Sequence, residues 1–167
     1  LHALVRAFAR ERANETDPPR MRSSAFERVA LLATQKTWGA YATIARSMSD
    51  SPRRSDFVYP ERDWTADEAS DWLYSQLSSL LAMAHAAPER GHPEILFHLS
   101  DGLSWWMNIA GRTIEALRLH QAAAEVASEI GAGRALATSS LDAGQLLLYS
   151  DDPRSAQAHF DRARILV

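Results

Sequence analysis

The six histidines are the residues of this chain best suited to metal binding or proton transfer. A zinc site on one helix needs two ligands four residues apart, so that both lie on the same face. His85 and His92 are seven residues apart, and His92 and His98 are six apart. The chain has no cysteine to complete such a site. We therefore expect no metal site, and we expect His120 and His159 to fill gaps between helices.

Acidic and serine-rich stretches provide the other candidate catalytic groups. Asp67, Glu68 and Asp71 offer carboxylates of the kind that general acid–base catalysis uses, but acidic residues also stabilise a helix N-terminus through its dipole. We favour the second explanation. The serine pairs at 78–79 and 139–140 lack the glycine-flanked turn of a serine hydrolase. We expect no enzyme, and a helical hydrolase or lyase is the least favoured hypothesis.

Charge and composition give no electrostatic reason to expect nucleic-acid or membrane binding. The 18 basic and 21 acidic residues leave a net charge of −3, and Arg53-Arg54 is the only adjacent basic pair in its loop. The lack of cysteine excludes disulfides and fits a cytoplasmic location. No apolar run approaches the roughly 20 residues of a membrane helix. We expect a cytoplasmic protein with no membrane contact and no direct contact to nucleic acid.

Apolar spacing and turn residues predict helices throughout the chain and no strand. The first helix covers residues 1–13 and ends before Pro18 and Pro19. The second begins at Ser24, because Ser24 and Glu27 have the spacing of a capping box, and it runs to about residue 48. A loop covers residues 49–63. The apolar stripe predicted for the second helix consists of Phe26, Val29, Ala33, Ala40 and Ile44.

A second capping box, formed by Thr65 and Glu68, opens the next helix, which Pro88 and Gly91 end. Four more helices are predicted from the residues that bound them. They run from Pro93 to Gly111, from the N-cap Thr113 to Gly131, from about Arg134 to Tyr149, and from Asp152-Pro153 onward.

A repeat with a period of 40 relates residues 97–163 to one another. The small residues Ser104 and Gly144 are 40 apart, and the same offset relates several other pairs. The pattern predicts a helix, a turn and a second helix, written twice, which is typical of a stacked helical array. The other pairs are Leu103 with Ala143, Met107 with Leu147, Ala116 with Ala156, His120 with Phe160, and Ala123 with Ala163.

The second copy of this repeat resembles a tetratricopeptide repeat. Its small pair Ala143-Gly144 lets two helices approach closely, Ala156 lies where the second helix crosses, and Phe160 closes the unit. In the first copy, His120 stands where that family usually has an aromatic residue. The resemblance implies an all-α, right-handed superhelix of helical hairpins. The period of 40 exceeds the usual value of about 34. It is closer to the longer repeats in the sensor arms of bacterial signalling ATPases.

Residues 1–12, LHALVRAFARER, resemble the end of the winged-helix part of NB-ARC (STAND-type) ATPases. In bacterial transcriptional regulators of the AfsR/SARP kind, a Met-His-Asp-Leu-like motif precedes a linking helix. An acidic-aromatic segment similar to residues 66–73, ADEASDWL, then leads into the repeats. The resemblance implies that His2 contacts the phosphates of ATP or ADP in the full-length protein. Ala3 replaces the usual aspartate, and the chain has no phosphate-binding loop, so we expect no cofactor within these 167 residues.

Trp105 and Trp106 are adjacent, so on a helix they point about 100° apart. Trp106 continues the apolar stripe of Leu99 and Leu103, and we expect it in the core. Trp105 either packs under a neighbouring helix or lies in the concave groove of the array, where an aromatic ring with polar neighbours binds a partner. The residues predicted to line this groove are His98, Asp101, Trp105, Asn108, Thr138, Leu141, Gln145, Leu148 and Tyr149.

Three parts are predicted: the tail of an upstream winged-helix domain (1–20), a linking helix and loop (21–63), and tetratricopeptide-like repeats that continue beyond the last residue (64–167). The leading functional prediction is the sensor and interaction arm of a signal-transducing ATPase that regulates transcription. Its partners would be a protein or small-molecule effector in the groove and the upstream nucleotide-binding domain, with self-association through an uncovered end. The alternative is a free-standing tetratricopeptide adaptor without a nucleotide switch.

Overall fold

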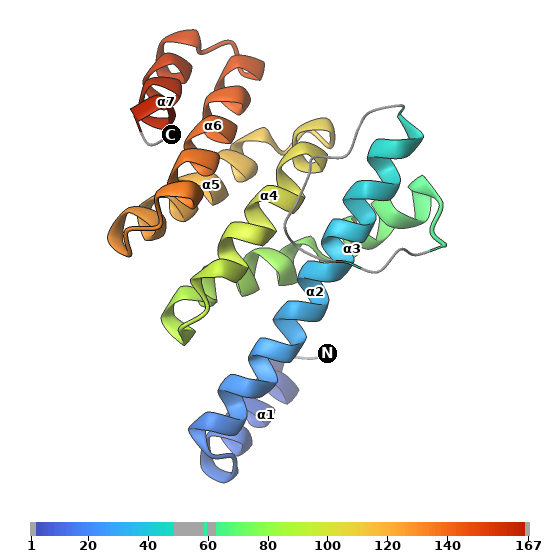
Figure 1. Ribbon diagram of the computed structural model, residues 1–167. Coiled ribbons are helices and arrows are strands. Elements are labelled where there is room, and N and C mark those ends of the chain that lie inside the picture. Colours follow the sequence, from blue (N-terminus) through green and yellow to red (C-terminus); the bar gives the residue numbers. More distant parts are fainter. Residues whose placement is uncertain (1–2, 49–58, 60–62, 166–167) are drawn as a thin grey trace.

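A computed structural model describes residues 3–48, 59 and 63–165, and within these residues the chain forms helices and no strand (Figure 1). None of the described helices is both long enough and apolar enough to cross a lipid bilayer. The helices are α1 (Ala3–Thr16), α2 (Pro19–Ser47), α3 (Ala66–Ala86), the short 3-10 helix η1 (Pro88–Arg90), α4 (Pro93–Ile109), α5 (Thr113–Glu129), α6 (Gly133–Tyr149) and α7 (Pro153–Ile165).

The last four helices follow one another at a constant spacing. They begin at residues 93, 113, 133 and 153, and α4, α5 and α6 each contain 17 residues. One helix and the short turn after it make a unit of constant length, and two such units make the period of 40 that the sequence contains. The helices predicted from that period are confirmed.

The turns before these four helices share one backbone geometry. In each of them a residue with positive φ ends the preceding helix: Gly91 (83°), Gly111 (73°), Gly131 (72°) and Asp151 (59°). The next amide donates a hydrogen bond to the carbonyl five residues earlier, which is the Schellman motif that satisfies the last carbonyls of a helix. These bonds join His92 to Ala87, Arg112 to Met107, Ala132 to Ala127 and Asp152 to Leu147, at 3.0, 2.8, 2.8 and 2.9 Å.

Helices α2 to α7 pack in a staggered order that forms a helical stack, defined here as α2 from Ala30 onward together with α3 to α7. In this stack α2 contacts both α3 and α4, α4 contacts both α5 and α6, and α6 contacts α7 (Figure 1). Fully buried leucines such as Leu73, Leu99 and Leu103 fill the interior. Trp106 is buried as predicted, and its indole nitrogen donates a hydrogen bond to Ser70 Oγ at 3.1 Å.

Small residues allow close approach at the α6–α7 contact. A Cβ atom added to Gly144 would lie 2.5 Å from Cε1 of Phe160, so the phenyl ring packs directly on the backbone of α6. The prediction that Gly144 permits this approach is confirmed.

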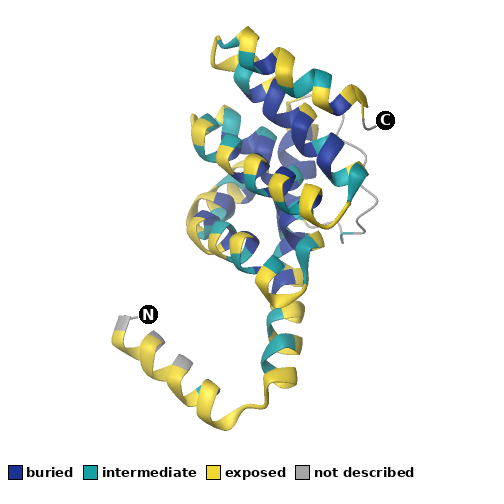
Figure 2. Cartoon of the chain, turned by 90° about the vertical axis from the view of Figure 1, so that its left-hand side faces the viewer, coloured by how far each residue is buried: buried dark blue, intermediate teal, exposed yellow. Residues whose placement is uncertain are grey.

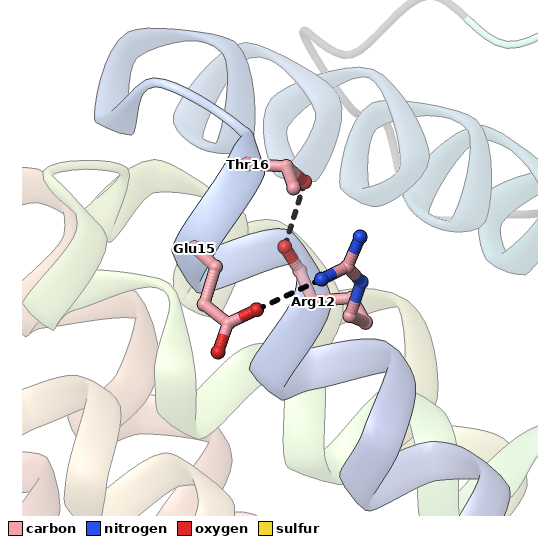
Figure 3. Close-up of polar contacts among 3 residues, drawn as sticks. All are labelled: Arg12, Glu15 and Thr16. Carbon is pink, nitrogen blue, oxygen red and sulfur yellow. Dashed lines mark hydrogen bonds and ion pairs between the residues drawn. The ribbon is translucent and has the colours of Figure 1, made fainter.

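The chain before Ala30 forms an N-terminal arm, defined as residues 3–29, that extends away from the stack (Figure 2). At its C-terminal end, Phe26 packs against the core of the stack, with its ring centroid 6.2 Å from that of His92. The contacts nearer the N-terminus are largely polar and local. Within α1, Arg12 lies 3.1 Å from the Glu15 carboxylate, and the Thr16 hydroxyl donates to the Arg12 carbonyl at 2.7 Å (Figure 3). Arg22 of α2 donates to two carbonyls at the end of α1, including that of Asn14 at 3.0 Å, and to the carbonyl of Asp17 just after it.

The start of α2 differs from the prediction. The helix begins at Pro19 and not at Ser24, because a proline in the first turn has the φ angle of a helix and lacks only an amide that would be unpaired there. Ser24 lies inside the helix, where its hydroxyl accepts a hydrogen bond from Arg28. Val29 was predicted to be buried but is 58% exposed, because it lies where α2 leaves the stack.

Other helix boundaries follow the prediction more closely. The capping box of Thr65 and Glu68 is confirmed, with both reciprocal hydrogen bonds formed. Thr113 is the first residue of α5 and not its N-cap, and its hydroxyl bonds to the Asn108 side chain at 2.9 Å. Asp152 accepts a hydrogen bond from the Ser155 amide and caps α7 as predicted. Most of the predicted loop at 49–63 lies outside the described residues.

Candidate functional site

A small pocket lies where α2, α4 and α6 meet. Its volume is about 80 Å³. Side chains from all three helices line it: Tyr41 from α2, Asp101, Ser104, Trp105 and Asn108 from α4, and Asp142, Gln145, Leu146 and Tyr149 from α6.

Helix periodicity explains which side chains reach this pocket. Asp101, Trp105 and Asn108 have the spacing i, i+4 and i+7, which places them on one face of α4. Asp142, Gln145 and Tyr149, at i, i+3 and i+7, share one face of α6 in the same way. Because α4 contacts α6 directly, these two faces border the same cavity.

A row of aromatic rings supports one wall of the pocket. The rings of Tyr41 and Trp105 meet edge to face, with centroids 5.7 Å apart, and Trp38 meets Tyr41 in the same way at 5.5 Å. The Trp38 indole nitrogen donates to the His98 carbonyl at 3.1 Å, and the Tyr59 ring stacks on that of Trp38 with centroids 6.2 Å apart. Trp105 therefore packs against a neighbouring helix, which is one of the two alternatives from the sequence, and it also lines the pocket.

Five of the nine predicted groove residues line the pocket: Asp101, Trp105, Asn108, Gln145 and Tyr149. Thr138 and Leu141 line a separate depression of about 340 Å³ between α6 and α7, next to Phe160. The half-exposed Leu148 lines neither cavity. His98 is partly buried and holds Trp38 through its backbone carbonyl. His2 lies outside the described residues.

Sequence reasoning missed a cluster of ionisable groups at the buried side of the pocket. Asp101, His120 and Asp142 each offer one ligand atom, and these three atoms all lie within 4.8 Å of one another. His120 is fully buried and Asp142 is 2% exposed, with Nε2 of His120 3.8 Å from Oδ2 of Asp142. His120 does fill a gap between helices as predicted, but the expectation of no metal-ligating group considered only ligand spacing along one helix. This cluster comes from three helices.

One sequence signal pointed to the cluster. His120 occupies the position at which the repeat pattern calls for an aromatic residue, and the corresponding residue 40 positions later is Phe160. A polar side chain at a buried repeat position needs a polar partner. The partner is found in the neighbouring helices, whose order in space the sequence alone does not give.

The pocket has an acidic lining. Two of its nine lining residues are aspartates, and no lysine or arginine is among the nine. Aromatic rings and neutral polar groups make up most of the remainder. The arrangement suits a positively charged group, since two carboxylates and the faces of aromatic rings both attract cations.

No family model, no characterised protein and no solved structure that was compared with this chain matches it.

Proposed function

We propose that this chain is the sensor and interaction arm of a signal-transducing ATPase that regulates transcription, built as a right-handed superhelix of tetratricopeptide-like hairpins. The helical order supports this proposal, because α2, α4 and α6 contact one another in turn while α5 and α7 each follow in a hairpin. In such an array the first helices of successive hairpins line the inner surface. A partner binds on that surface.

The observation that carries the proposal is the pocket between α2, α4 and α6. It joins an aromatic side chain, Trp105, with the polar groups of Asp101, Asn108 and Gln145. Such a combination is typical of sites where one anchoring group of a partner binds. Its volume of about 80 Å³ is well below the roughly 300–1,000 Å³ of a pocket that encloses a whole small molecule. The size favours a protein partner that inserts one side chain.

Signalling requires that the partner distinguish two states of the full-length protein. A partner shifts the balance between a resting and an active state only by the difference in its affinity for them. In this proposal ATP or ADP binds to the upstream domain, His2 contacts its phosphates, and residues 1–167 contribute no catalytic group. The protein acts in the cytoplasm without direct contact of this region to nucleic acid.

The full-length protein provides the test. The sequence upstream of Leu1 should encode a phosphate-binding loop, and partner binding should change the rate of ATP hydrolysis. Gln145→Ala changes an exposed pocket residue and should weaken the partner's effect while leaving basal hydrolysis unchanged. Trp105→Ala should weaken it further, because it removes an aromatic wall of the pocket.

Ile130→Ala is the matched control, because Ile130 is exposed at the end of α5 and lines neither described cavity on α6. It should leave the response unchanged. If no phosphate-binding loop precedes Leu1, the signalling proposal fails and the adaptor without a nucleotide switch takes its place. If the loop is present but the two pocket variants respond as the wild type does, the pocket is not the partner site.

A further inference from the structure

We propose that Asp101, His120 and Asp142 bind a divalent first-row transition-metal ion at the buried side of the pocket. The inference goes beyond the proposed function, because metal binding here requires neither a partner nor an upstream nucleotide domain. Five features carry it: the separation of the donor atoms, their positions on three packed helices, their chemical type, their charges, and the cavity beside them.

The donor atoms are close to the spacing that one ion requires. Ligand atoms that bind one transition-metal ion at about 2.0–2.2 Å lie roughly 3.0–3.5 Å from one another. In the structure Nε2 of His120 is 3.8 Å from Oδ2 of Asp142, and the three donor atoms of the cluster all lie within 4.8 Å. Binding of one ion therefore requires the three donor atoms to move closer together through small changes in their side-chain torsions.

Each ligand comes from a different helix of the stack. Asp101 belongs to α4, His120 to α5 and Asp142 to α6, and each of these helices contacts the other two. The turns that join them have the same Schellman geometry. Ligands on rigid, mutually packed elements are held in place before the ion arrives, which favours binding.

The types of donor atom select the ion. Two carboxylate oxygens and one imidazole nitrogen suit Mn²⁺, Fe²⁺, Co²⁺ and Zn²⁺, whereas Mg²⁺ and Ca²⁺ favour sites made of oxygen alone. An organic cation such as an ammonium group would be attracted by the carboxylates but would gain little from the imidazole. A transition-metal ion uses all three groups, so it is the ligand that the whole cluster fits.

The charges of the cluster favour the same ion. Asp142 and His120 are buried, and a buried carboxylate is stabilised by opposite charge placed directly against it. A protonated imidazole brings one positive charge to the two carboxylates. A divalent ion brings two and leaves the imidazole neutral.

The neighbouring cavity leaves room to complete the coordination shell. Asp101 and Asp142 both line the pocket, whose volume of about 80 Å³ exceeds the roughly 10–15 Å³ that a single water needs, so it can hold water ligands. Ser104, Asn108 and Gln145 line the same pocket and offer hydrogen-bonding groups to such waters. The coordination positions that face the pocket would therefore be occupied by exchangeable waters.

The test is metal titration of the full chain after treatment with a chelator. Isothermal calorimetry with Zn²⁺, Mn²⁺ and Mg²⁺ should give one saturable site for the two transition metals and much weaker binding of Mg²⁺. Co²⁺ should produce visible d–d absorption that saturates at one equivalent per chain. Addition of Zn²⁺ should displace the Co²⁺ and abolish this absorption. The bound ion should raise the melting temperature, because it binds the folded state alone.

Asp101→Asn is the decisive variant, since Asp101 is only partly buried and the change keeps the shape of the side chain. It should reduce Zn²⁺ affinity at least tenfold while the circular dichroism spectrum stays unchanged. Asp71→Asn, at an exposed acid of α3, is the matched control and should leave affinity unaltered. The proposal is overturned if the wild type binds no stoichiometric transition metal, or if Asp101→Asn binds Zn²⁺ as tightly as Asp71→Asn does.

Discussion

The N-terminal arm and the helical stack contain the same kind of amphipathic helix but use it differently. In the arm, apolar residues remain in contact with solvent: Leu4 is 72% exposed, Phe8 63% and Met21 62%. In the stack, Leu99 and Leu103 are fully buried. Figure 2 shows the same contrast, with the N-terminal helix mostly in the colour of exposed residues and the stack rich in buried ones. Apolar spacing thus determines where a helix forms and which face is apolar. What covers that face depends on the neighbouring elements.

The two regions also differ in how they are stabilised. Exposed polar contacts of the kind that Arg12 and Glu15 make contribute about 0.2–1 kcal/mol each. Complete burial of a leucine contributes roughly 1.5–3 kcal/mol. The stack should therefore determine the global stability, while the arm should fold and unfold locally.

The largest effect expected from this comparison is the loss of a core leucine. Leu99→Ala should lower the free energy of unfolding by about 2–5 kcal/mol, because it removes a fully buried side chain and leaves a cavity. Phe8→Ala in the arm should change it by less than about 0.5 kcal/mol. Urea denaturation measures both. Equal losses would show that the arm packs on the stack in solution and would remove the distinction.

A smaller effect is expected at the close contact of α6 with α7. Gly144→Ala should cost roughly 1–3 kcal/mol, because the new methyl group overlaps the Phe160 ring. Gly133→Ala, at the start of the same helix, is the control: its added Cβ meets no atom within 4 Å, so stability should not fall. Adding Phe160→Leu to Gly144→Ala should recover part of the loss. No recovery would mean that the contact is looser than the structure shows.

Substitutions at the positive-φ residues in the turns of the stack should change the free energy of unfolding by about 1 kcal/mol or less. Gly111→Ala should cost about 1 kcal/mol, since an alanine at φ 73° is strained. Asp151→Gly should do the opposite and stabilise the protein by about 0.5 kcal/mol, because Asp151 is the one described non-glycine residue with positive φ. Thermal unfolding monitored by circular dichroism separates the two. A loss of stability in Asp151→Gly would point to a role of the aspartate side chain itself.

The smallest expected effect is a pH dependence that originates in the stack, because the arm contains no histidine. Partial burial, and then the nearby Arg162, lower the pKa of His159 below its usual value of 6.5. The unfolded chain then binds a proton at His159 more tightly than the folded chain does. The contribution of neutral His159 to the free energy of unfolding is therefore fully present above pH 6.5, and it is lost as the pH falls through the lowered pKa.

Urea denaturation of the wild type and of His159→Gln between roughly pH 5 and 8 measures this contribution. The wild type should gain stability relative to the variant as the pH rises to about 6.5. A slope of the opposite sign would mean that a charged partner favours the protonated form of His159.

The features that the sequence predicts best are those that depend on residues within one helical turn of each other. Thr65 and Glu68 form their capping box because both partners lie within one turn, and Gly111 and Gly131 end their helices because the turn itself requires a positive φ. Ser24 shows the limit of such signals. Its spacing to Glu27 is also that of a capping box, but Pro19 begins the helix more than one turn earlier.

Features that depend on several helices were not accessible in this way. Helical periodicity places Leu141, Gln145 and Leu148 on related faces of α6, but only contact with α2 and α4 decides that Gln145 borders the pocket and Leu141 a different depression. The cluster of Asp101, His120 and Asp142 is a stronger case. Its members are distant in sequence, one on each of three successive helices, and meet only because α4, α5 and α6 pack together.

The regular turns have a consequence for how such a chain can change its length. Turns with the same geometry follow η1, α4, α5 and α6, yet successive helices of the stack run in opposite directions. Deleting or duplicating a whole hairpin preserves the direction of every later helix, whereas a change of one helix reverses it and exchanges the two sides of the array. This architecture therefore tolerates the insertion or deletion of residues in whole hairpins. The backbone repeats with every helix, because each turn has the same geometry. The side-chain pattern repeats only with every hairpin, because alternate helices lie on opposite sides of the array and their side chains have different neighbours.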